Sequence, residues 1–133
     1  MPAFCHTYGN LAKPFPGGLQ TRPRACLVLG DVGGTFRNEE RIYKKKDTDA
    51  ERTAARTACI KLWKWWVGEF GLRADQEPAQ CKGNIDDIVD ATVTATVAWL
   101  YYRHPERLTK LGTVPSDETG RGPFWVLRKR SAA

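Results

Sequence analysis

The sequence predicts an α/β fold with a short β-sheet and two main helices, and three observations support it. A continuous apolar run at residues 25–29 is typical of a buried strand. Apolar residues recur at three- and four-residue spacing over about 50–69, which indicates a helix. The segment 84–103 has acidic residues near its start, which also indicates a helix. The segment 124–127 indicates a closing strand. Because 133 residues suit one core, residues 25–130 are predicted to form a single domain.

The N-terminal residues 1–24 are expected to form an irregular arm. Proline and glycine punctuate this segment, and both residue types favour turns. They occur at Pro14, Pro16, Gly17, Gly18 and Pro23.

The predicted strand at 25–29 leads into a glycine-rich turn that contains Asp31. Such a turn allows the backbone to approach an anion closely, but it is equally typical of a plain hairpin. The next segment, 36–46, is expected to form a second strand that ends in the basic run Lys44-Lys45-Lys46. This run is either a solvated strand end or a set of phosphate contacts.

Asp47 or Thr48 is expected to cap the helix at about 50–69. Trp66 belongs to its apolar stripe and is expected in the core. Trp63 and Trp65 cannot both join that stripe, so they either complete a wide buried face or form a surface that stacks bases.

Asn84 is a good N-cap for the second long helix, and Pro105 ends it. Asp86, Asp87 and Asp90 follow within its first turns, on one flank. They either complement the helix dipole or hold a divalent cation through oxygen ligands. The alternating Thr and Val residues of 92–97 favour a strand, but the cap and the early acids favour a helix.

Polar connections are expected around this helix. Residues 72–83 form a linker, and residues 105–122 form a loop with a short helical turn at about 106–111.

The run Asp-Asp-x-x-Asp-Ala at 86–91 resembles the last catalytic helix of RNase H-fold nucleases. The similarity is greatest to the predicted RNase H-like nucleases of unknown function, because an acidic-glycine step and a short strand follow at 117–127. It covers about residues 52–128 and is most specific over 84–98. The resemblance implies a small or truncated RNase H-like fold, since the expected upstream half is short.

The same resemblance implies a nuclease that hydrolyses phosphodiesters with Mg²⁺ or Mn²⁺. It assigns catalytic roles to Asp31, Asp86, Asp87 and Asp90, and metal ligation to Asp87, Asp90 and Asp31. Glu39 or Glu40 is the alternative to Asp31. A chain that lacks a complete site would hold two metals only as a homodimer.

The formal net charge of +6 and the pI of about 9.3 favour a polyanionic partner such as DNA or RNA. The alternative to a nuclease is therefore a basic module that binds nucleic acid without cutting it, and a small interaction protein is a third hypothesis. The expected nucleic-acid contacts are Lys44, Lys45, Lys46, Trp63, Trp65, Arg128, Lys129 and Arg130.

The sequence has no apolar run long enough for a membrane span and no visible secretion signal, so a cytoplasmic protein is expected. Its four cysteines include no C-x-x-C pair, which fits a reduced compartment. A zinc site from Cys5, His6, Cys26 and Cys81 would match no standard spacing, and we do not expect one.

Overall fold

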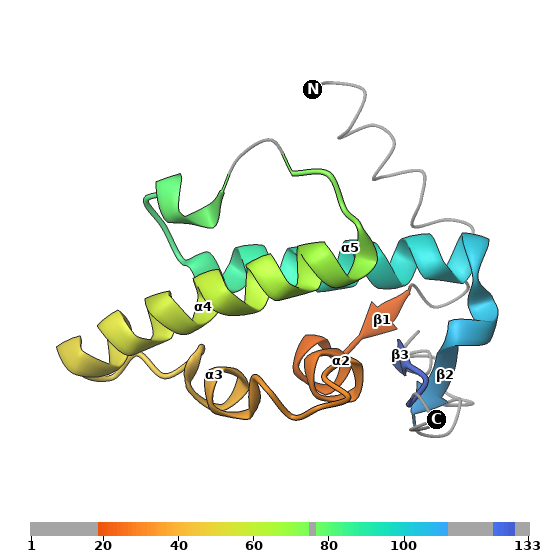
Figure 1. Cartoon of the computed structure of the whole chain (residues 1–133), viewed down its shortest axis with the longest axis horizontal. Helices are drawn as coiled ribbons and strands as arrows, with labels where there is room; N and C mark the ends of the chain where they lie inside the picture. The colour runs from red at the N-terminus through yellow and green to blue at the C-terminus, as the bar shows by residue number, and fades with distance from the viewer. Residues whose placement is uncertain (1–18, 75–76, 112–123, 130–133) are drawn as a thin grey trace, which may run out of the picture.

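The computed structural model describes residues 19–74, 77–111 and 124–129. In these ranges the chain is α/β, with four α-helices and a small three-stranded mixed sheet (Figure 1). The elements are β1 (Gln20–Thr21), α2 (Pro23–Gly30), α3 (Arg37–Ile42), α4 (Asp49–Phe70), η1 (Pro78–Gln80), α5 (Ile85–Arg103), η2 (Pro105–Arg107), β2 (Leu108–Leu111) and β3 (Phe124–Leu127).

The sheet has the order β1-β3-β2, so the last strand lies in the middle. β3 pairs in parallel with β1, where Thr21 lies opposite Trp125. It pairs antiparallel with β2, where Lys110 lies opposite Trp125 and Leu108 lies opposite Leu127. The sheet stands at one end of the long helix pair, next to α2 (Figure 1).

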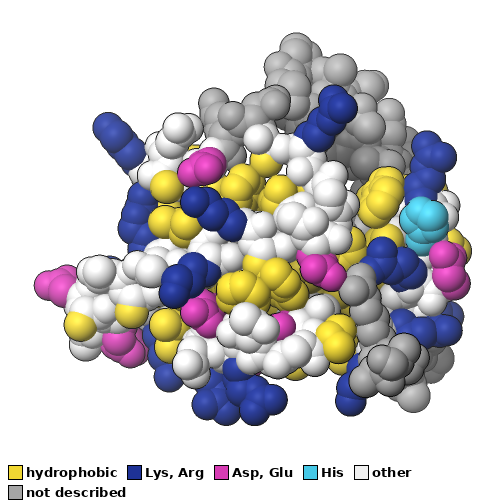
Figure 2. Space-filling model, in the orientation of Figure 1, with side chains coloured by type: hydrophobic (Ala, Val, Ile, Leu, Met, Phe, Trp, Pro, Cys, Tyr) yellow, Lys and Arg dark blue, Asp and Glu magenta, His cyan; other side chains and the backbone are white. Residues whose placement is uncertain are grey.

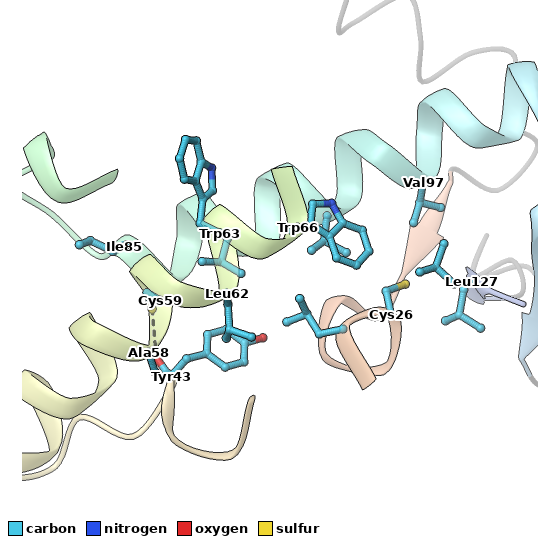
Figure 3. Packing of buried hydrophobic residues seen from close by; sticks show 14 of the residues in the cluster. Cys26, Tyr43, Ala58, Cys59, Leu62, Trp63, Trp66, Ile85, Val97 and Leu127 are labelled. Carbon is cyan, nitrogen blue, oxygen red and sulfur yellow. Dashed lines mark hydrogen bonds between the residues drawn. The ribbon is translucent and has the colours of Figure 1, made fainter. Parts of the chain in front are cut away.

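The core lies between α4, α5, α2 and the sheet, because each presents an apolar face to the others. Trp66 is 1% exposed, and its indole nitrogen donates to the hydroxyl of Thr96 on α5 at 2.9 Å. Figure 3 shows Cys26 of α2 and Leu127 of β3 on the same side of α4 as Tyr43. Trp63 projects from the opposite side of α4.

The two long helices begin differently. Thr48 and Glu51 form a capping box at the start of α4, with both hydrogen bonds at 3.1 Å. Gly71 ends α4 in the left-handed conformation with φ of 60°, which a glycine adopts without strain. Asn84 occupies the N-cap position of α5 as predicted, but its side chain makes no capping hydrogen bond.

Both long helices and the closing strand are confirmed. The predicted strand at 25–29 is wrong, because these residues belong to helix α2. A five-residue apolar run does not distinguish a buried strand from a buried helix segment, and Pro23 at the first turn fits a helix start. Burial is one-sided: Leu27 is 2% exposed and Val28 is 49% exposed.

The predicted strand at 36–46 is also wrong, because Arg37–Ile42 form helix α3. Glu39 and Glu40 in its first turn suit a helix N-terminus, and the segment contains few β-branched residues. The turn expected at 106–111 is a 3₁₀ turn only at Pro105–Arg107, and strand β2 follows it. The predicted arm contributes β1 and the start of α2, while residues 1–18 lie outside the described residues.

Within the described ranges, no helix has the length and apolar character needed to cross a membrane.

Candidate functional site

The start of α5 carries an ionic network around Asp86 and Asp90. These residues are four apart, so their carboxylates lie on one flank of the helix. Lys44 contacts both carboxylates, with its Nζ 3.3 Å from Oδ2 of Asp86. Lys46 Nζ lies 2.6 Å from the other oxygen of Asp86. The hydroxyl of Tyr43 donates to Oδ1 of Asp90 at 3.0 Å.

These three partners come from the segment that joins α3 to α4. Tyr43 is 1% exposed and anchors the segment in the core, where its carbonyl oxygen also lies 3.6 Å from Sγ of Cys59 (Figure 3). Lys44 and Lys46 remain partly exposed and extend their ammonium groups to α5. The network therefore ties the α3–α4 connection to the first turns of α5.

The ion pairs shift the pKa values of Asp86 and Lys44 away from their usual values. Burial by itself would raise the pKa of Asp86, but the hydrogen bonds and charges of Lys46 and Lys44 outweigh it, so the pKa lies below its usual value. Burial would lower the pKa of Lys44, yet Asp90 and Asp86 outweigh it and raise the pKa. Asp86 and Lys44 are consequently both charged at neutral pH.

Tyr43 and Cys59 stay neutral beside this network. Burial, followed by the negative charge of Asp90, raises the pKa of Tyr43 above its usual value. Burial and the charge of Asp86 raise the pKa of Cys59 to about 12. The Cys59 thiol therefore carries no nucleophilic thiolate at neutral pH.

The structure brings Asp86 and Asp90 together, but it places Asp87 and Asp31 elsewhere. Asp87 is exposed on another side of α5. Asp31 accepts hydrogen bonds from the backbone amides of Thr35 at 3.0 Å and Phe36 at 2.6 Å. Its carboxylate thus stabilises the turn before α3.

The two alternatives to Asp31 lie on α3. Glu39 lies 3.7 Å from Lys61 Nζ on α4. The Oε2 atom of Glu40 is buried and accepts no hydrogen bond within the described part of the chain.

This arrangement does not fit a pair of divalent metals. All four carboxylate oxygens of Asp86 and Asp90 already face a lysine or tyrosine donor. Among the described residues, no three His, Cys, Asp or Glu side chains are grouped to hold a metal ion. Mg²⁺ or Mn²⁺ binding stays a prediction, and it would require displacement of Lys44 and Lys46.

The predicted stacking residues are less open than a base-binding surface requires. Trp65 is half-buried and stacks on Phe36, with ring centroids 4.9 Å apart. Trp63 is 8% exposed. It lines a hollow of about 300 Å³ between α4 and α5 together with Trp99, which is 43% exposed.

A second group of cations surrounds the sheet, and we call it the cation surface. It consists of Arg22, Arg107, Lys110, Arg128 and Lys129. All of these side chains are exposed except that of Arg107, which is half-buried. Figure 2 shows Lys and Arg side chains at the right-hand end of the molecule, where Figure 1 places the sheet.

Aromatic rings lie beneath three of these cations. The guanidinium carbon of Arg22 lies 4.1 Å from the ring centroid of Phe124, and Nζ of Lys110 lies 5.2 Å from that of Trp125. The guanidinium carbon of Arg107 lies 5.1 Å from the ring centroid of Phe70.

Two cations of the predicted basic tail belong to this surface. The amide of Arg128 donates to the carbonyl oxygen of Arg107 at 2.7 Å, which joins the end of β3 to the start of β2. Arg128, Lys129 and Arg107 line a hollow of about 200 Å³, together with Glu69 and Glu106. Arg130 lies outside the described residues, and Lys45 is exposed beside the ionic network.

Sequence reasoning missed Tyr43, Trp99 and most of the cation surface. Arg22, Arg107 and Lys110 are isolated in the sequence and become neighbours of Arg128 only through strand pairing. The sequence does hold a signal for Trp99. The small residue Ala95 lies one helical turn before it on the same side of α5 and leaves space beside its ring.

Comparisons with known proteins gave no match to any family model, curated protein or solved structure.

Proposed function

We propose that the protein binds nucleic acid through its cation surface and does not cut it. The supporting observation is the gathering of five Lys and Arg side chains around a sheet of three short strands. Lys and Arg that neutralise phosphates release condensed counterions, and this drives sequence-independent binding. The formal net charge of +6 adds long-range attraction.

The geometry of the surface also favours a phosphate backbone. Arg107, Arg128 and Lys129 converge on one hollow, so three cations can reach a single phosphate or two adjacent ones. Glu69 and Glu106 line the same hollow and oppose anion binding there. Lys110 and Arg22 lie over aromatic rings, a combination that single-strand binders use.

The ionic network supports the non-cutting part of the proposal. Asp86 and Asp90 are neutralised by Lys44 and Lys46, so a metal would have to compete with two ammonium groups. The resemblance of residues 86–91 to RNase H-like nucleases fits the same proposal, as that of a divergent chain with an acidic helix start and no cutting site. Metal-dependent cleavage stays the competing hypothesis.

Binding is tested with fluorescein-labelled DNA and RNA, single- and double-stranded, by fluorescence anisotropy in EDTA. We expect binding that survives EDTA and weakens steeply between about 50 and 200 mM salt. The double variant Arg128→Glu/Lys129→Glu should weaken it by about tenfold or more. The matched control is Lys61→Glu/Lys64→Glu on α4, which changes the net charge equally and should weaken binding far less.

Cleavage is tested by incubating the same oligonucleotides with Mn²⁺ or Mg²⁺. We expect no product from the wild-type chain. Cleavage that disappears in both Asp86→Asn and Asp90→Asn would overturn the proposal and favour the nuclease hypothesis. Equal binding by the two charge-reversal double variants would show that the cation surface is not the contact.

A further inference from the structure

The hollow between α4 and α5 has the composition of a stacking site, and we call it the tryptophan groove. Its volume is about 300 Å³. The lining residues are Trp63, Val67, Leu72, Arg73, Ala74, Thr92, Ala95, Thr96 and Trp99. Apolar and aromatic groups make up most of this lining, and Arg73 is the one charged residue among the described residues that form it.

The two indoles have different roles in the groove. Trp63 is almost fully buried, so it belongs to the fixed wall on the α4 side (Figure 3). Trp99 on the α5 side keeps 43% of its surface exposed, although burial of a tryptophan is strongly favourable. Ala95, one turn before Trp99, leaves space beside the ring. A flat apolar group could therefore enter next to Trp99.

The polar groups of the groove offer little for reading a sequence. The hydroxyls of Thr92 and Thr96 already donate to backbone carbonyl oxygens of α5, at 2.7 and 2.8 Å. Thr96 also accepts from the buried indole of Trp66. An aromatic ring in the groove would thus be held by stacking rather than by specific hydrogen bonds, which suits any base.

Arginine side chains lie at the rim of the groove and between the groove and the cation surface. Arg73 is exposed at one edge. Arg103 is exposed one turn after Trp99 on the same side of α5, and the rings of Trp99 and His104 are 5.6 Å apart. η2 follows directly and carries Arg107 of the cation surface. A backbone of phosphates held by the cation surface could therefore pass Arg103 and reach the groove.

We infer that the tryptophan groove receives an unpaired base of a single-stranded nucleic acid, with Arg73 and Arg103 holding the flanking phosphates. The inference rests on the proposed function and deepens it, because it names the single strand as the preferred ligand. A duplex keeps its bases paired and stacked, so it can use the cation surface but not the groove.

The test compares a fluorescein-labelled single-stranded DNA 20-mer with a duplex of the same sequence, by anisotropy in EDTA. We expect the wild-type chain to bind the single strand about tenfold more tightly than the duplex. Trp99→Ala removes the stacking ring, and Ala95→Phe fills the groove from its exposed wall. Each should weaken single-strand binding by about tenfold and leave duplex binding unchanged.

Tyr102→Ala is the matched control, because Tyr102 is an aromatic residue of α5 that is 52% exposed and is not among the residues that line the groove. It should leave both affinities unchanged, and circular dichroism should show that every variant keeps its thermal midpoint. Equal wild-type affinities for the two ligands, or unaltered single-strand binding by both groove variants, would overturn the inference and leave the proposed function standing. No binding of either ligand would instead defeat the proposed function.

Discussion

Two regions of this chain carry the same kinds of charged side chain and use them differently. In the ionic network, Lys44 and Lys46 point inward at carboxylates, and the Asp86 side chain is 9% exposed. In the cation surface, Lys110, Arg128 and Lys129 point into solvent. In the ionic network the charges pair with one another and hold the start of α5 in place. In the cation surface the charges remain available to a ligand.

A basic run in a sequence therefore does not by itself mark a binding site. The run at 44–46 is the most basic stretch of the described chain, yet two of its three lysines have internal partners. The cation surface is assembled from scattered residues: Lys110 lies on β2, Arg107 lies in η2, and the others directly follow β1 or β3. Its members share no run except at 128–129.

The largest expected effect is on the stability of the ionic network. Asp86→Ala leaves Lys46 and part of Lys44 without a partner and removes charge-assisted hydrogen bonds, so it should lower the free energy of unfolding by about 2 kcal/mol. The lysines are partly exposed, which keeps the loss below that of a fully buried pair. Asp87→Ala, one residue along, should change it by less than about 0.5 kcal/mol. Urea unfolding measures the free energy of unfolding of both variants. Equal losses would contradict the conclusion that Asp86, and not Asp87, anchors the ionic network.

The same network predicts how stability depends on pH. Because the pKa of Asp86 is lower in the folded chain than in the unfolded chain, its contribution is complete above the unfolded value of about 3.9. It is lost as the pH falls through the folded pKa. The stability difference between wild type and Asp86→Asn should therefore be constant from about pH 5 to about pH 8 and shrink below about pH 4. A difference that grew toward acid would mean that Asp86 is not held as a carboxylate.

A smaller effect concerns how each long helix begins. Thr48→Ala removes the capping box of α4 and should cost about 1 kcal/mol. Asn84→Ala should cost less than about 0.5 kcal/mol, because the Asn84 side chain makes no capping hydrogen bond and the lysines stabilise the start of α5. Thermal unfolding of the two variants would separate these cases, and a greater loss at Asn84 would argue against the network as the anchor.

The smallest effect on stability is expected at the cation surface. Lys129→Gln should change the unfolding free energy by less than about 0.5 kcal/mol, since the side chain is exposed. It should weaken nucleic-acid binding uniformly across sequences and reduce the salt slope of log K by about 1. Lys44→Gln should show the reverse pattern, with stability lost and the slope retained. If both variants behave alike, the contrast between the two regions fails.

The sequence alone determined the two long helices and the closing strand. Helical spacing, capping residues and terminal prolines or glycines act within a few residues of one another, so Thr48, Gly71 and Pro105 can be recognised without the fold. The proximity of Asp86 and Asp90 follows from the same local geometry. The partners of these acids do not, because Lys44 and Lys46 are about 40 residues away in the chain.

The remaining elements, and which charged side chains are paired inside the molecule, depend on contacts between distant parts of the chain. Whether residues 25–29 are strand or helix depends on which neighbour buries them, and here α5 and β3 pack against α2. The sheet joins strands far apart in the chain, so neither the pairing of β1 with β3 nor the cation surface leaves a local signal. Local geometry sets where a carboxylate or an ammonium group points, but its role depends on the group that folding brings to face it.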